Sequence, residues 1–268
     1  MAAETVDRAR GWGRVRRTAF LVWAAVLAML VGITFVGVTA LTILMWLANQ
    51  NADTNPVTDL GFFALGAVIV ATGFAVQLRD AERKVAGAQQ AIIGLLALGV
   101  AGLIGERAEP LAGSVALLVA SAILVALHPA RRELFRVGRS LSIPLAALSA
   151  LAAVPALGYS QAMLVQARQA GPSCFFGQCA YGDRLSEMAA LAIAVVALGL
   201  LTATRPPGWE LSAWSAGAAT FIVGSASIVW FELPESLGQA GGMATVVWGL
   251  LFAATAEWEK RRGTRVPA

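Results

Sequence analysis

Eight long apolar stretches constrain this chain more than any other feature. A helix needs roughly 20 mostly apolar residues to cross the hydrocarbon core of a bilayer. Eight segments meet this requirement, and they are residues 19–47, 60–78, 89–105, 111–128, 141–166, 186–203, 211–231 and 241–258. The pattern predicts an all-α integral membrane protein with about eight transmembrane helices.

The composition excludes the other broad classes of protein. Charged residues make up 13% of the chain and hydrophobic residues 58%, with a mean hydropathy of +0.71. An average soluble domain has about 25% charged residues, and a disordered chain is rich in charge and poor in apolar residues. Neither class fits this chain, so contact with a lipid bilayer is expected.

The first apolar stretch is longer than one membrane crossing requires. Residues 19–47 exceed the length of a cleavable signal peptide, and no small-residue cleavage site follows them. We therefore expect a retained helix that either tilts in the bilayer or projects beyond it.

The loop charges alternate along the chain. Basic residues gather at both ends and in the segment after the fourth stretch, whereas the first loop carries Asp53 and Asp59 and no basic residue. The positive-inside rule then places both termini in the cytoplasm. The expected organisation is a basic N-terminal segment (1–18), a first four-helix unit (19–128), a basic cytoplasmic linker (129–140), a second four-helix unit (141–258) with an outer loop (167–185), and a basic tail (259–268). We expect the protein in the plasma membrane, which here means a bacterial inner or cell membrane.

Several loop residues recur at a spacing near 126. Glu-x-x-Glu-x-Leu occurs at residues 106–111 and again at 232–237, and Arg79 and Arg205 each follow an even-numbered stretch. Two parallel four-helix repeats, related by an axis along the membrane normal, would leave this pattern. Alternating loop charge would also place similar residues in every second loop, so the sequence leaves both explanations open.

The predicted outer loop contains both cysteines. Cys174 and Cys179 are separated by four residues, whereas redox-active pairs usually have two residues between them. Because disulfides persist outside the cytoplasm, we expect a structural disulfide in this loop. A redox dithiol is the alternative.

The fifth stretch is the least regular. Pro144 and Pro155 each remove a backbone donor and are expected to kink the helix. A span that is interrupted in this way, and that carries clustered polar side chains, indicates a cavity. The cavity candidates are Pro155, Tyr159, Ser160, Gln161 and, near the middle of the eighth stretch, Trp248. The alternative is a kinked, packed helix whose polar groups face the outer interface.

Acidic residues mark two predicted outer loops. Glu106 and Glu109 lie in one, and Glu232 and Glu235 lie in the other. Carboxylates from both loops would bind a cation if they converged, but such residues more often end a helix in water. We therefore predict no metal site.

The scarcity of reactive residues excludes many activities. The chain has one histidine, His128, and two lysines, Lys84 and Lys260, both in predicted cytoplasmic segments. No nucleotide-binding loop, nucleophile elbow or histidine cluster is present. We expect no catalytic residue and no cofactor, favour a protein without enzymatic activity, and find no sign of nucleic-acid binding.

Two functional hypotheses remain. The first is a permease-like protein that handles a small neutral or lipophilic solute, or a lipid. The second is a non-catalytic membrane subunit or scaffold, which would assemble with partner subunits or with copies of itself. A cavity that reaches Tyr159 favours the first, and a solid interior favours the second.

Overall fold

The protein is an all-helical membrane protein. A computed structural model describes residues 2–47, 55–135, 138, 140–171 and 181–263. Within these ranges 85% of the residues are helical and no strand occurs. Side chains are described from residue 15 to 44 in the first range and up to residue 262 in the last. Cys174 and Cys179 lie outside the described residues, so their disulfide stays a prediction.

Eight helical spans within the described residues are long and apolar enough to cross a membrane, which confirms the predicted fold class. The second span is composite, because α2, the π-helix η1, α3 and α4 follow one another. The helices are α1 (Ala2–Leu47), α2 (Pro56–Phe63), η1 (Ala64–Ala71), α3 (Thr72–Ala75), α4 (Gln77–Asp80), α5 (Val85–Ile104), α6 (Ala108–Leu127), α7 (Ile143–Gln169), α8 (Tyr181–Ala203), α9 (Trp209–Val229) and α10 (Gly238–Gly263). A short 3₁₀ turn, Glu133–Phe135, lies between α6 and α7.

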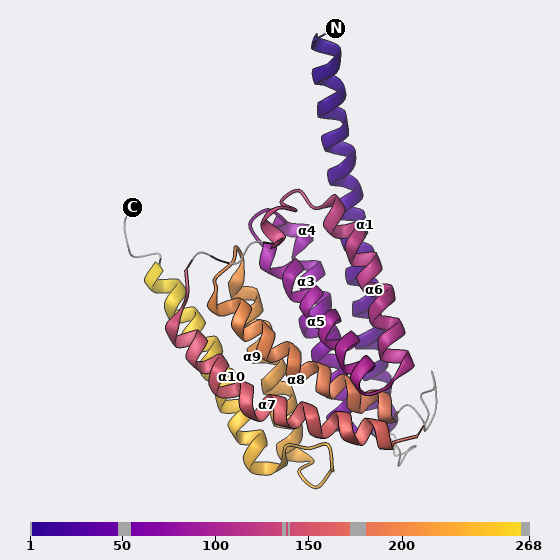
Figure 1. Ribbon diagram of the computed structural model, residues 1–268, viewed down its shortest axis with the longest axis vertical. Coiled ribbons are helices and arrows are strands. Elements are labelled where there is room, and N and C mark those ends of the chain that lie inside the picture. Colours follow the sequence, from indigo (N-terminus) through magenta and orange to yellow (C-terminus); the bar gives the residue numbers. More distant parts are fainter. Residues whose placement is uncertain (1, 48–54, 136–137, 139, 172–180, 264–268) are drawn as a thin grey trace.

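The first helix projects far beyond the rest of the bundle, as Figure 1 shows. Within α1, the part from Val15 to Leu44 has the length and hydropathy of a membrane span. The first predicted span therefore lies within a longer helix of 46 residues, and its tilt in a bilayer or projection beyond it stays a prediction. The two described chain ends lie on the same side of the bundle (Figure 1), which we call the terminal side.

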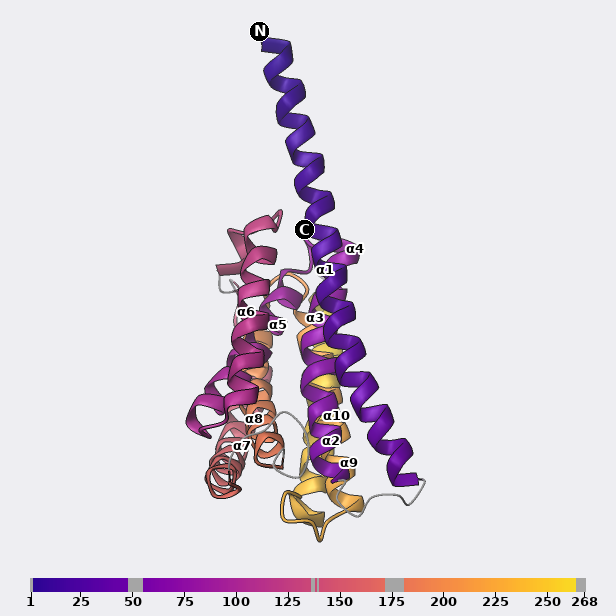
Figure 2. The same cartoon turned by 90° about the vertical axis from the view of Figure 1, so that its right-hand side faces the viewer.

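The spans form two layers, which Figure 2 shows side by side. One layer contains α6, α5, α8 and α7, and the other contains α1, the composite second span, α9 and α10. The inner four spans are the composite second span, α5, α8 and α9, and 56% to 67% of the residues in the most apolar 18-residue stretch of each are buried. In the outer four spans, α1, α6, α7 and α10, 17% to 28% of these residues are buried. The inner spans therefore form the core, and the outer four present most of their surface to lipid.

Two polar contacts between inner spans help to join the layers. Gln90 Nε2 on α5 donates to Ser215 Oγ on α9 at 2.9 Å. At the end opposite the terminal side, Arg184 Nε on α8 lies 4.0 Å from Asp59 Oδ1 on α2. Both contacts join polar groups of inner spans, and in both pairs the two residues are 125 positions apart.

Local sequence explains where α2 and α7 begin. Asn55 caps α2 by accepting from Val57 N at 3.1 Å and Thr58 N at 3.3 Å, and Ser142 caps α7 by accepting from Leu145 N at 3.3 Å. Pro144 lies in the first turn of α7, where the missing N–H has no helical partner to lose. The prediction of a kink at Pro144 is wrong for this reason, and Pro155 is the proline inside the helix.

His128 joins three spans on the terminal side. Its Nε2 lies 3.1 Å from Gln77 Oε1, and its Nδ1 accepts from Ala130 N at 3.0 Å. The ring is buried and meets Phe20 edge-on, with 5.1 Å between ring centroids. Arg16 on α1 donates to the carbonyls that end α6, including His128 O at 3.0 Å. Burial, with a smaller contribution from the Arg16 charge, lowers the pKa of His128 to about 4.

This low pKa predicts a loss of stability in mild acid. An unfolded histidine has a pKa near 6.5, so between about pH 6.5 and 4 the unfolded chain binds a proton that the folded protein does not. The stability that neutral His128 provides is present above pH 6.5 and falls as the pH drops towards 4. His128→Gln should remove this part of the pH dependence. Melting temperatures at pH 4.5 and 7.5 test this, and an equal drop in both proteins would contradict it.

Candidate functional site

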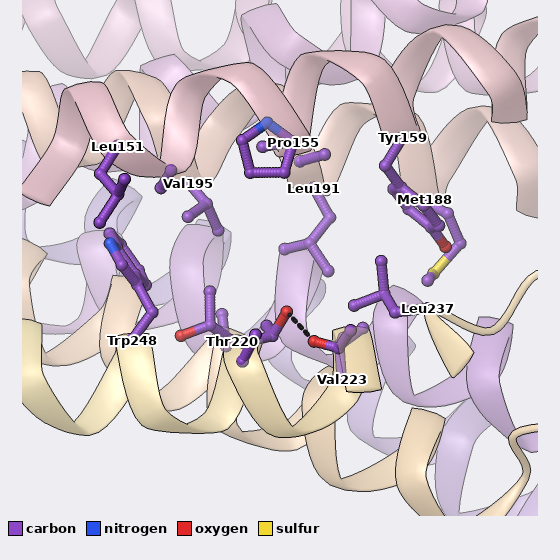
Figure 3. A pocket seen from close by; sticks show the side chains of 17 residues that line it. Leu151, Pro155, Tyr159, Met188, Leu191, Val195, Thr220, Val223, Leu237 and Trp248 are labelled. Carbon is purple, nitrogen blue, oxygen red and sulfur yellow. Dashed lines mark hydrogen bonds between the residues drawn. The ribbon is translucent and has the colours of Figure 1, made fainter. Parts of the chain in front are cut away.

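A cavity of about 370 Å³ lies between α7, α8, α9 and α10 (Figure 3). Most of the side chains that line it are apolar, and none is charged. The lining residues are Leu151, Ala152, Pro155, Ala156 and Tyr159 of α7, Met188, Leu191, Ala192 and Val195 of α8, Ala219, Thr220 and Val223 of α9, and Leu237, Gly241, Ala244, Thr245 and Trp248 at the start of α10 and along it.

One face of α7 forms one wall of the cavity. Leu151, Pro155 and Tyr159 follow one another at four-residue spacing, which places them on the same side of a helix. Proline has no N–H, so Pro155 cannot bond to the carbonyl of Leu151 one turn earlier. Such a carbonyl is tolerated in a membrane protein where the backbone lines a cavity.

The cavity opens towards the lipid-facing surface and has a buried floor. Leu151 is 69% exposed although it lines the cavity, and Pro155 is also exposed. On the inner helices, by contrast, Met188 and Ala219 are buried. The opening therefore lies between α7 and α10, which are outer spans. The inner helices α8 and α9 form the floor of the cavity.

The polar side chains in the wall use their donors within the protein. Tyr159 Oη donates to Glu235 O at 2.7 Å, and Trp248 Nε1 donates to Leu148 O at 2.9 Å. Thr220 Oγ1 donates to Ala216 O at 2.9 Å, and Thr245 Oγ1 donates to Gly241 O at 2.8 Å. A molecule in the cavity thus meets an apolar surface whose few donors are already occupied.

Aromatic packing closes the end of the cavity nearest the terminal side. Trp248 stacks on Phe252 with 4.8 Å between ring centroids and an interplanar angle of 16°. The indole hydrogen bond to α7 joins the two outer helices at this point. Figure 3 shows Trp248 and Leu151 at one end of the cavity, and Tyr159, Met188 and Leu237 at the other.

A network of buried and half-buried charges lies beyond the Tyr159 end, around the first described residues of α8. Arg184 Nη1 donates to Glu187 Oε2 at 3.0 Å, and its guanidinium carbon lies 3.9 Å from the centre of the Phe62 ring. Arg107 is buried, donates to carbonyls at the end of α7, including Gly171 O at 2.5 Å, and lies 4.0 Å from Asp183 Oδ1. These contacts link the loop before α6, the end of α7 and the start of α8.

The structure places some of the candidate residues in this site and others outside it. Pro155, Tyr159 and Trp248 line the cavity. Ser160 is buried and Gln161 is exposed, and neither lines it.

The four acidic candidates have different surroundings. Glu106 is exposed and lies 3.9 Å from Arg168 Nε, and Glu232 is exposed. Glu109 is half-buried, and Glu235 is buried and accepts from Asn55 Nδ2 at 2.6 Å. Within the part of the chain that the structure describes, no group of three or more His, Cys, Asp or Glu side chains is arranged to hold a metal ion.

Sequence reasoning missed the floor of the cavity. Met188, Leu191 and Val195 are apolar residues in an apolar helix, so no composition or spacing distinguishes them from packed core residues. It also missed the partners of Arg184, which was expected in an outer loop and instead lies near the start of α8, within the helix.

Comparisons of the chain with models of protein families, with curated proteins and with solved structures gave no match.

Proposed function

We propose that this multi-pass membrane protein is permease-like and binds a lipophilic molecule, the chain of a lipid or of a similar amphiphile, in the cavity between α7 and α10. The observation that carries the proposal is the apolar lining of a cavity that opens on the lipid-facing surface. A polar solute would lose its hydration there and find no free donor in exchange. An apolar chain from the bilayer has no hydration to lose, because it moves from one apolar environment to another.

The position and size of the cavity support this ligand class. At about 1.5 Å per residue, Pro155 lies about 18 Å from Ile143 along α7, and Trp248 about 15 Å from Gly238 along α10. Both distances are near the middle of the helices, where a bilayer contains only hydrocarbon. A volume of about 370 Å³ lies within the range of roughly 300 to 1,000 Å³ that is usual for small-molecule sites.

We also infer that the chain consists of two parallel four-helix units, residues 19–128 and 141–258. If each span of the first unit is replaced by its counterpart in the second unit, the first by the fifth, the second by the sixth and so on, and vice versa, one layer of Figure 2 becomes the other. Where two units related by a two-fold axis touch at that axis, residues at equivalent positions of the two units contact each other. The contacts of Gln90 with Ser215 and of Asp59 with Arg184 each join residues 125 apart, which supports such an axis along the membrane normal.

The two units differ where the cavity lies. In the first unit, Phe35 of α1 stacks on Phe62 with 4.1 Å between ring centroids and fills the space beside Gly66. In the second unit the space beside α7 stays open. The proposed binding site therefore belongs to the second unit alone.

Filling the cavity tests the proposed function. Ala156 lines the cavity and is half-buried, so Ala156→Phe should place a ring in the space of the ligand and weaken lipid binding at least about tenfold. Ala150→Phe is the matched control, since Ala150 lies on α7, is exposed and does not line the cavity. The measurement is the fraction of protein that retains a lipid in native mass spectrometry after extraction from membranes.

The control determines how the result is read. Loss of lipid in Ala156→Phe with retention in Ala150→Phe supports the proposal. Equal retention in wild type and both variants would contradict it and favour a scaffold without a ligand.

A further inference from the structure

The loop between α9 and α10 covers one end of the cavity. Leu237, its last residue, lines the cavity beside Tyr159 (Figure 3). Glu235 is the point where the loop contacts two other spans. Its backbone carbonyl accepts from Tyr159 Oη at 2.7 Å, and its carboxylate accepts from Asn55 Nδ2 at 2.6 Å.

The two ends of the cavity are held with different strength. At the Trp248 end, whole helices pack together, and Ser142 Oγ, which caps α7, donates to Glu259 Oε2 on α10 at 2.6 Å. Arg205 also pairs with Glu259 there. At the Tyr159 end, the loop is held to α7 by the hydrogen bond of one hydroxyl group and to the start of α2 by the hydrogen bond from Asn55 to Glu235. The Tyr159 end is therefore the one that opens at lower cost.

The loop has an anchored side and a pivot. Ser236 Oγ donates to Ser227 O at 3.0 Å, and Leu237 N donates to Ser227 Oγ at 3.2 Å, so this side stays attached to α9. Gly238, with a φ of +69°, lets the chain turn into α10. A loop fixed to α9 and turning at a glycine can move away from α7 without unfolding either helix.

We propose that this loop gates the outer end of the cavity, where the polar end of the ligand enters and leaves, and that the hydrogen bond from Tyr159 to Glu235 holds this gate closed, while the apolar chain lies along the opening between α7 and α10. The inference rests on the proposed function. The ligand is an amphiphile with one apolar chain, which lies towards Trp248, while its polar end stays at the gate. The loop charges predict that this end of the bundle faces the outside, so the ligand is exchanged on the outer side of the membrane.

Exchange kinetics of a fluorescent single-chain fatty acid with the purified full-length protein test the gate. Tyr159→Phe keeps the ring and removes the hydroxyl group. Opening the gate more often speeds entry as well as exit, so the association and dissociation rate constants should both rise about fivefold. Thr34→Val is the control, because it removes a hydroxyl hydrogen bond, to Leu30 O at 2.8 Å, on the exposed side of α1.

Each outcome separates the gate from the binding site. Faster association and dissociation in Tyr159→Phe, with wild-type rates in Thr34→Val, support the gate. A rise in the dissociation rate alone would make Tyr159 a ligand contact and overturn the gate, as would unchanged rates. If the wild-type protein bound no probe, the proposed function would fail and the gate with it.

Discussion

Replacing Arg184 with methionine should lower the free energy of unfolding by about 3 kcal/mol or more. The guanidinium group pairs with Glu187 at 3.0 Å and with Asp59 at 4.0 Å, and the side chains of all three residues are at most 24% exposed. Methionine fills a similar volume over the Phe62 ring but leaves two carboxylates in a poorly solvated place without their cation. Thermal or denaturant unfolding of the purified protein in detergent measures the loss.

A second substitution shows whether charge is the cause. Glu187→Gln in the Arg184→Met background removes one of the two carboxylates and should recover part of the lost stability. Arg168→Met is the control, because Arg168 and Glu106 form a pair at 3.9 Å whose side chains are 49% and 78% exposed, and exposed pairs contribute at most about 1 kcal/mol. An equal loss at Arg168 and Arg184, or no recovery in the double variant, would contradict the account.

The second large effect is expected at the contact of α9 with α10. A Cβ atom at Gly224 would lie 2.8 Å from Gly242 O and 2.9 Å from Val246 Cγ2, so the two backbones meet without room for a side chain. Gly224→Leu should separate these helices and cost about 3 kcal/mol. Because both helices line the cavity, the variant should also bind less lipid.

Gly113 provides the matched control for this substitution. It lies on the exposed side of α6, and a Cβ atom there would meet nothing within 4 Å. Gly113→Leu should leave the melting temperature unchanged or raise it, since leucine favours a helix more than glycine does. A similar loss of stability in the two variants would show that the close approach of α9 and α10 is not what Gly224 provides.

The membrane fold could be predicted from the sequence because it depends on long-range composition. Twenty apolar residues in a row have few other stable arrangements, and all eight spans form where hydropathy places them. Helix ends were less predictable. The sixth span already includes Tyr181, whereas hydropathy places its start at residue 186, because Asp183 and Arg184 lie within the helix, where Arg107 and Glu187 are their partners.

The cavity could be predicted only in part. Pro155 and Tyr159 break the pattern of an apolar helix, and this pointed to α7. Which residues face them depends on how four helices cross, and that is decided by contacts between residues far apart in the chain. Gln161 was expected at the cavity for the same reason, but it lies two residues after Tyr159 and is exposed on another side of α7.

The central claim is that the space between α7 and α10 holds an apolar chain. An electron cryo-microscopy map of the protein in lipid nanodiscs, bound to a rigid antibody fragment for size, tests it most directly. We expect an elongated density that passes Pro155, ends at Trp248 and disappears in Ala156→Phe. A map in which α7 and α10 close on each other, with lipid density only on the outer surface of the bundle, would contradict it.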